Sequence, residues 1–159
     1  MDQEFEGKVV LVTGAARGLG RAVAEGFARR GASLFLVDVL AERLEATRAE
    51  LADGGATVRT MAADIASRDA CFRAVAAAVD AFGKLDVLCN VAAVLRFNHV
   101  TAIEEAEWRK VLDVNLSAPF FLAQAAIPHL IESRGNIVNV TSQAAHRVRC
   151  GRSCSRARA

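Results

Sequence analysis

Three glycines and one carboxylate form the pattern in this sequence that is best suited to binding a charged ligand. Gly14, Gly18 and Gly20 follow an apolar run and lead directly into a helical pattern. Glycine tolerates positive φ angles and lets a backbone approach a ligand closely, and a helix N-terminus offers free N–H groups to a phosphate. Asp38 closes the next apolar run, at the distance expected for a ribose-binding carboxylate. The pattern predicts a dinucleotide site; the alternative is a helix-entry turn without a ligand.

Asp38 and Arg17 favour different cofactors. The Asp38 carboxylate would accept hydrogen bonds from an adenosine ribose and repel a 2′-phosphate, which favours NAD. Arg17, inside the glycine loop, could pair with that phosphate and so favours NADP. Because Arg17 can turn to solvent while the carboxylate stays, we expect NAD, with NADP as the weaker candidate. Alternatively, Asp38 is only an acidic residue at the start of the second helix.

Alternating strands and helices must position these residues. The hydrophobic pattern predicts strands at 8–13, 33–37, 57–62, 86–90 and 136–140, and helices at 18–30, 41–52, 68–82 and 102–130. Right-handed crossovers then give an α/β, Rossmann-like, doubly wound parallel sheet of order 3-2-1-4-5. We expect Ser67 to cap the third helix, a capping box at 101–104 to start the fourth, and a bend near Pro119.

The spacing T-G-x-x-x-G-x-G from Thr13 to Gly20 resembles the glycine motif of the short-chain dehydrogenase/reductase family. The resemblance covers residues 7 to about 145, and it implies a Rossmann-like sheet that is truncated after strand five. It implies an oxidoreductase that transfers a hydride between NAD and a small-molecule alcohol or carbonyl substrate. The cofactor-binding residues implied by position are Gly14, Arg17, Gly18, Leu19, Gly20, Asp38, Asp64, Ile65, Asn90 and Ala92.

Two segments add to the implied cofactor site. By resemblance, Asp64 contacts the adenine amino group together with the backbone of Ile65; from the sequence alone, Asp64 is equally a loop acid. Residues 90–93, Asn-Val-Ala-Ala, resemble the family element Asn-Asn-Ala-Gly. Val91 replaces the second Asn of that element, which removes an amide that braces the sheet. Ala93 replaces the Gly, which adds a methyl group beside the expected cofactor path.

Asn115 and Ser142 are the candidate catalytic residues. Asn115 lies in Asp-Val-Asn-Leu, which resembles a family motif whose Asn distorts a helix and anchors a water in a proton relay. The alternative is an exposed helical Asn. Ser142 follows the fifth strand, where the family places the hydroxyl that binds the substrate carbonyl and its developing oxyanion. Without the resemblance, Ser142 would be a turn former.

The expected proton donor is missing. The resemblance implies a Tyr-x-x-x-Lys motif about a dozen residues beyond Ser142, but the sequence contains no Tyr and its last Lys is Lys110. Loss of a general acid costs on the order of 10²–10⁴ in rate. Whether the chain is an enzyme therefore stays open. The alternative function is a catalytically inactive dinucleotide-binding fragment.

The composition changes at residue 146. Residues 1–145 are interpreted as an incomplete NAD(P)-binding Rossmann domain, and 146–159 as an Arg-rich tail that we expect to be disordered. The chain has 20 basic and 18 acidic residues, and the tail contributes five arginines and no acid, so residues 1–145 carry a net charge of −3. The abrupt change in composition indicates a shifted reading frame or a truncated gene product. Because the basic residues are confined to this tail, binding of the domain to nucleic acid is disfavoured.

The remaining features favour a cytoplasmic protein. No run of eighteen apolar residues predicts a membrane span, and the acidic N-terminus does not resemble a signal peptide. The four cysteines and three histidines lack the spacing of a metal site, so we expect none. Cys71 and Cys89 lie in apolar patterns and should be buried. By resemblance, the fourth helix could pair two copies of the chain.

Overall fold

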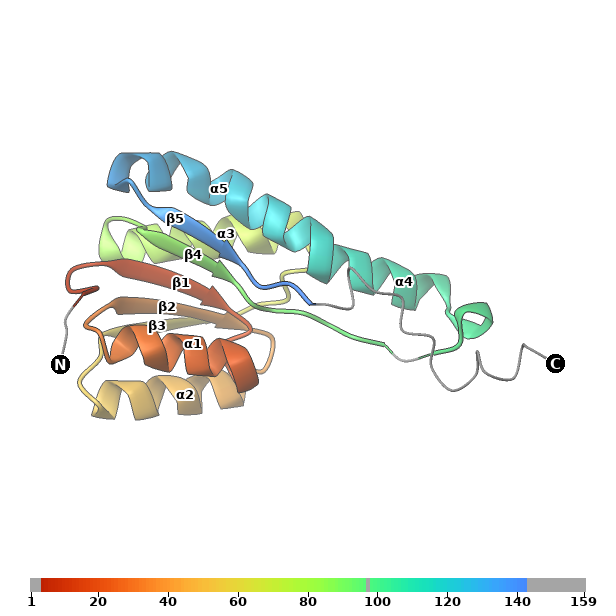
Figure 1. Cartoon of the computed structure of the whole chain (residues 1–159), viewed down its shortest axis with the longest axis horizontal. Coiled ribbons are helices and arrows are strands. Elements are labelled where there is room, and N and C mark those ends of the chain that lie inside the picture. The colour runs from red at the N-terminus through yellow and green to blue at the C-terminus, as the bar shows by residue number, and fades with distance from the viewer. Residues whose placement is uncertain (1–3, 97, 143–159) are drawn as a thin grey trace.

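The protein, described here as a computed structural model of residues 4–96 and 98–142, contains one parallel sheet with helices on both faces (Figure 1). The sheet order is β3-β2-β1-β4-β5, as the sequence predicts. The strands are β1 Val9–Thr13, β2 Ser33–Asp38, β3 Val58–Ala62, β4 Val87–Asn90 and β5 Asn136–Asn139. The main helices are α1 Gly18–Ala28, α2 Ala41–Asp53, α3 Arg68–Phe82, α4 Glu105–Leu112 and α5 Ala118–Ser133.

Alternating side chains of the central strands separate the core into two layers. Val10 and Val12 of β1 pack with the layer under α1 and α2, whereas Val9 and Leu11 pack with the layer under α3 and α5. All five residues of β1 are buried, as expected for a parallel strand covered on both faces. The carboxyl ends of β1 and β4 therefore meet at the point where the strand order reverses, which is where doubly wound sheets bind ligands.

The third helix begins as expected, and the fourth differs from the expectation of one helix over 102–130. The Ser67 hydroxyl accepts a hydrogen bond from Ala70 N at 3.1 Å and caps α3. Residues Val100–Ala102 form a separate 3-10 turn, so the capping box at 101–104 does not start the helix, and Glu104 makes no side-chain cap.

A π-helical turn, Asp113–Ser117, separates α4 from α5 at the place where a bend was expected. Pro119 lies in the first turn of α5 and has no N–H to continue the α-helical pattern from residue 115. The Ala118 N–H bonds to Asp113 O instead. The irregular turn therefore lies directly before the proline, and the helical stretch continues through it.

The helical stretch Glu105–Ser133 is long and apolar enough to cross a membrane by length and composition alone. Leu122, Ala126 and Leu130 are nevertheless buried in the layer between α5 and the sheet, as in a core helix of a domain. Another side of this stretch exposes Leu116, Phe120, Ile127 and Ile131. The spacing of these four residues places an apolar stripe along one side of the helix.

Asp86, just before β4, is a buried carboxylate that fastens the amino ends of the central strands. It accepts hydrogen bonds from Val9 N and Lys8 Nζ, both at 2.9 Å, and Lys84 Nζ lies 3.1 Å away. Burial by itself raises the Asp86 pKa, but the bonds from Val9, Lys8 and Lys84 outweigh it, so the pKa is lowered overall.

We expect Asp86 to make stability depend on pH in the acid range. Because its folded pKa is depressed, its contribution is complete above the unfolded value of about 3.9 and is lost as the pH falls through the folded pKa. The difference in unfolding free energy between wild type and Asp86→Asn should be largest near about pH 6 and shrink below about pH 4. Urea unfolding at several pH values measures it; a difference that stays constant would contradict this assignment.

Candidate functional site

A cavity of about 620 Å³ opens at the carboxyl ends of β1, β2 and β4. Nine of the ten predicted cofactor residues line it: Gly14, Arg17, Gly18, Leu19, Gly20, Asp38, Asp64, Ile65 and Ala92. The exception is Asn90, which is buried and is not among the lining residues. The structure therefore brings together residues from the glycine loop and from the ends of β2, β3 and β4.

The glycine loop is shaped by close backbone contact as well as by positive φ angles. Gly14 has φ +71°, and a Cβ there would lie 2.8 Å from Ala92 Cα in the segment after β4. Gly18 has φ +56° and begins α1, whose N-terminus opens onto the cavity. A Cβ at Gly20 would lie 2.1 Å from Gly14 O. Glycine at these positions lets the first turn of α1 close against the end of β1.

Asp38 holds the glycine loop as well as lining the cavity. One carboxylate oxygen accepts a hydrogen bond from Ala16 N at 3.0 Å, and the other accepts one from Leu40 N at 3.0 Å. The second bond lies just ahead of α2. It fits the alternative in which Asp38 is an acidic residue at the start of the second helix. The first bond ties the loop to the end of β2. Both ribose binding and loop support are compatible with this geometry, since a carboxylate has further acceptor capacity.

Asp64 and Ile65, which follow β3, also line the cavity. The Asp64 carboxylate accepts hydrogen bonds from Lys110 Nζ on α4 and from Ala66 N. The bond from Lys110, followed by that from Ala66, lowers the Asp64 pKa, so the group is charged at neutral pH. Ile65 is buried in the core beneath it. Lys110, which the sequence analysis did not assign to the site, is thus a lining residue brought in by α4.

Thr13 is a second residue that the sequence analysis missed. Its buried hydroxyl accepts hydrogen bonds from Val91 N at 3.1 Å and Ala92 N at 3.2 Å, and it donates to Cys89 O at 3.4 Å. One side chain at the end of β1 therefore orients the segment after β4 that forms a cavity wall. The signal was present, since Thr13 directly precedes the first glycine of the motif.

Asn90 joins β4 to β5. Its amide Nδ2 donates to Asn139 Oδ1 at 2.8 Å, and the residue is buried. In the described part of the chain, its Oδ1 is the buried side-chain oxygen without a hydrogen-bond partner. Asn90 therefore joins the two strands, next to the segment 91–94 that lines the cavity.

Asn115 lies in the π-helical turn and faces the segment after β4. Its Oδ1 accepts a hydrogen bond from Val94 N, and its Nδ2 donates to Val94 O, both at 2.8 Å. The helix irregularity that its motif implied is present, and its side chain has specific partners. Ser142 is exposed at the end of the described residues, beyond β5, and is not among the cavity-lining residues. The expected tail at 146–159 lies outside the described residues.

The described cysteines and the possible metal-ligating side chains are the remaining groups with reactive side-chain atoms. Cys71 and Cys89 are buried, as expected, and burial raises the pKa of each thiol to about 11. Both are therefore protonated at neutral pH and unsuited to nucleophilic work. Within residues 4–96 and 98–142, no group of three or more His, Cys, Asp or Glu side chains is placed to hold a metal ion.

The strand order and the position of the cavity define an α/β domain of the doubly wound type, a class that binds ligands at the point where the strand order reverses. A family model described as short chain dehydrogenase matches residues 8–154. The chain belongs to the short-chain dehydrogenase/reductase family, whose members are oxidoreductases.

Known relatives agree with this assignment. The chain is 39% identical over 145 residues to D-threitol dehydrogenase of Mycolicibacterium smegmatis, an alignment that covers 91% of this chain and 56% of the relative. A metagenomic short-chain oxidoreductase in complex with NADP matches with a TM-score of 0.83 and 34% identity, over 87% of this chain and 63% of that one. Carveol dehydrogenase from Mycobacterium avium in complex with NAD matches with a TM-score of 0.84 and 26% identity, over 91% and 57%. The chain spans about half the length of the curated relatives it matches.

Proposed function

We propose that the cavity binds NAD in preference to NADP and that it is the cofactor half of an oxidoreductase acting on a small alcohol or carbonyl compound. The observation that carries the proposal is the Asp38 carboxylate at the end of β2, which lines the cavity. A negative charge there favours ribose hydroxyls and disfavours a 2′-phosphate. Arg17 is exposed on the loop and can turn away from the site.

The residues present fit such a cofactor. Gly18, Leu19 and Gly20 put the N-terminus of α1 on the cavity, where its free N–H groups suit a pyrophosphate. Asp38 would receive the adenosine ribose, and Asp64 with Ile65 would border the adenine. When bound, the nicotinamide ring supplies or accepts the hydride.

Two residues of this chain would serve the reacting end, in keeping with their motifs. Ser142 would donate a hydrogen bond to a substrate carbonyl. Asn115, whose side chain is bonded to Val94, would hold the segment after β4 and anchor a water. Neither residue is a strong acid near neutral pH, so neither replaces the missing Tyr.

A catalytically inactive dinucleotide-binding fragment is the second candidate function. It is favoured by the sequence, which has no Tyr and no Lys after Lys110. Titration of the chain with NADH, followed by fluorescence, tests binding; a chain that ignores about millimolar cofactor contradicts both candidates. An assay over several alcohols with NAD then separates them, because robust turnover excludes the inactive fragment.

Substitution of Asp38 by Asn should shift the cofactor preference. Removing the negative charge should lower the ratio of the NADPH to NADH dissociation constants by about tenfold, or about 1.4 kcal/mol. Weakened support of the loop affects both cofactors alike, so the ratio isolates the charge. Glu42→Gln, an equal loss of charge at the exposed start of α2, is the control. An unchanged ratio in the Asp38 variant would refute the preference we assign to this carboxylate.

Further parts of the proposal concern assembly and location. The apolar stripe of Leu116, Phe120, Ile127 and Ile131 would pair two copies of the chain through α5. Sedimentation in solution tests the pairing, and a monomer at all accessible concentrations would contradict it.

A cytoplasmic location also stays a prediction, consistent with a small-molecule substrate.

A further inference from the structure

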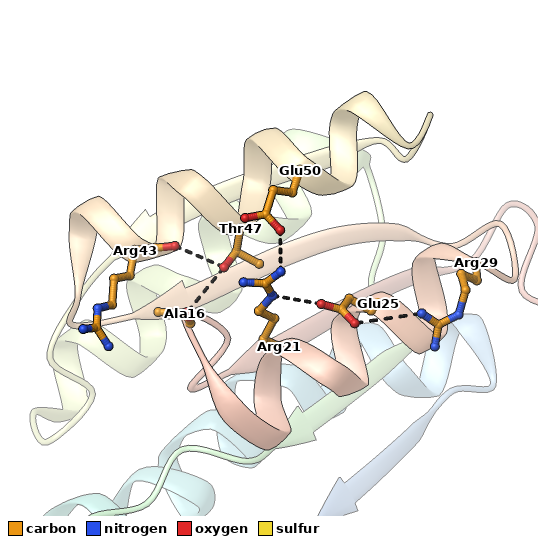
Figure 2. Close-up of polar contacts among 7 residues, drawn as sticks. All are labelled: Ala16, Arg21, Glu25, Arg29, Arg43, Thr47 and Glu50. Atoms are coloured by element: carbon orange, nitrogen blue, oxygen red, sulfur yellow. Dashed lines mark hydrogen bonds and ion pairs between the residues drawn. The ribbon is translucent and has the colours of Figure 1, made fainter.

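A buried hydroxyl on α2 contacts the glycine loop that precedes α1. Thr47 is only 1% exposed, and its Oγ1 lies 3.3 Å from Ala16 O (Figure 2). The same hydroxyl lies 3.1 Å from Arg43 O on its own helix, so its one proton serves two carbonyls. A valine would fill the same space without a polar atom. The hydroxyl is therefore explained by its hydrogen bonds rather than by packing.

The loop at Ala16 is held through both of its peptide groups. Ala16 N donates to Asp38 Oδ2 at the end of β2, and Ala16 O accepts from Thr47 on α2. Since the peptide unit is planar and trans, fixing the Ala16 carbonyl also fixes the Arg17 N–H, which points the opposite way. Arg17 is the N-cap of α1 and lines the cavity. Holding this one peptide thus orients the entry into α1.

An ion-pair network keeps α2 in place against α1. Arg21, in the first turn of α1, bonds to Glu25 at 2.8 Å and reaches across to Glu50 on α2 (Figure 2). The hydrogen bond with Glu25 and the nearby charge of Glu50 raise the pKa of Arg21. Arg29 lies 3.9 Å from the second Glu25 oxygen. These contacts join the two helices that flank the loop, so Thr47 sits at a defined place relative to it.

We propose that Thr47 is a positioning residue that orients the glycine loop for a pyrophosphate. The proposal rests on the proposed dinucleotide binding and deepens it. Its physical basis is preorganisation: a loop whose N–H groups already point correctly loses less conformational entropy when the ligand arrives. Asp38 binds the Ala16 N–H and would also face the ribose. Thr47 binds the Ala16 carbonyl, so it would affect the ligand only through the position of the loop.

Dissociation constants for ligands with and without phosphates test the proposal. Thr47→Val should raise the dissociation constants of NADH and ADP by about 3- to 10-fold, the loss expected for one hydrogen bond. It should leave the constant for adenosine, which has no phosphate, unchanged. Thr47→Ser keeps the hydroxyl and should restore wild-type values. Thr60→Val is the control and should bind as wild type, because it removes a hydroxyl on β3 that bonds to the Glu45 side chain and not to the glycine loop.

The possible outcomes separate the proposal from a purely structural role. Wild-type binding of NADH and ADP by Thr47→Val overturns it, as does equal weakening of ADP and adenosine. If Thr47→Val does not fold, hydrogen exchange of the wild-type chain decides. There, NADH should protect amides at 15–20 and 44–48 together, and protection of the loop alone overturns the proposal. A wild-type chain that binds neither NADH nor ADP instead refutes the dinucleotide site itself.

Discussion

Replacement of Gly20 by Ala is expected to lower the free energy of unfolding by about 3–5 kcal/mol and to abolish NADH binding. A Cβ at this position would lie 2.1 Å from Gly14 O and 2.6 Å from Gly14 C. Both atoms belong to the backbone, so no side-chain rotation relieves the overlap. The first turn of α1 would have to separate from the end of β1. The cavity requires the close approach of these two elements, so the separation would disrupt it.

Gly26→Ala is the matched control for that variant. Gly26 lies in the same helix, and the nearest atom to its added Cβ would be the flexible Arg30 Nη1 at 3.8 Å. Since Ala is the better helix former by about 1 kcal/mol, this variant should be stabilised. Chemical unfolding with parallel NADH titration measures both proteins. Equal stability of the two variants would show that the closeness of Gly20 to Gly14 is not required.

Loss of the Thr13 hydroxyl is expected to be the second large effect. In Thr13→Val, the N–H groups of Val91 and Ala92 lose their shared acceptor inside the protein. Each unsatisfied buried donor costs about 1–3 kcal/mol, so we expect a loss of about 2–4 kcal/mol in unfolding free energy. NADH binding should weaken as well, because Ala92 forms part of the cavity wall.

Thr13→Ser separates the hydroxyl from the methyl group. It keeps the acceptor for both N–H groups and should cost only about 1 kcal/mol through the lost methyl. Urea unfolding of the two variants side by side measures the contrast. If the Ser and Val variants were equally destabilised, packing rather than hydrogen bonding would be the function of Thr13.

The sequence could not predict how Asp38, Asn90 and Asn115 are used, since their partners lie far away in the chain. Asp38 bonds to Ala16, Asn90 to Asn139, and Asn115 to Val94. A side chain's residue type limits its hydrogen bonds, but the tertiary fold selects the partner. Asn90 was assigned to the cofactor site by motif, and the fold shows in addition that it joins β4 to β5 through Asn139. The irregular helix around Asn115 was anticipated as a bend, whereas its π-helical form depends on local hydrogen bonding that periodicity does not encode.

Whereas Asp64, Ile65 and Ala92 were assigned to the site only through the family resemblance, periodicity and glycine spacing by themselves determined the sheet order, the loop at 14–20 and the place of Asp38 at the end of β2. Those features follow from local backbone preferences and from the handedness of strand–helix–strand crossovers, which are written in consecutive residues. Only the tertiary structure decided that Thr13 supports the segment after β4, that Thr47 reaches the loop, and that Lys110 pairs with Asp64. These contacts join residues 31 to 78 positions apart. They form because packing of the layers brings the side chains together, and no local pattern records that proximity.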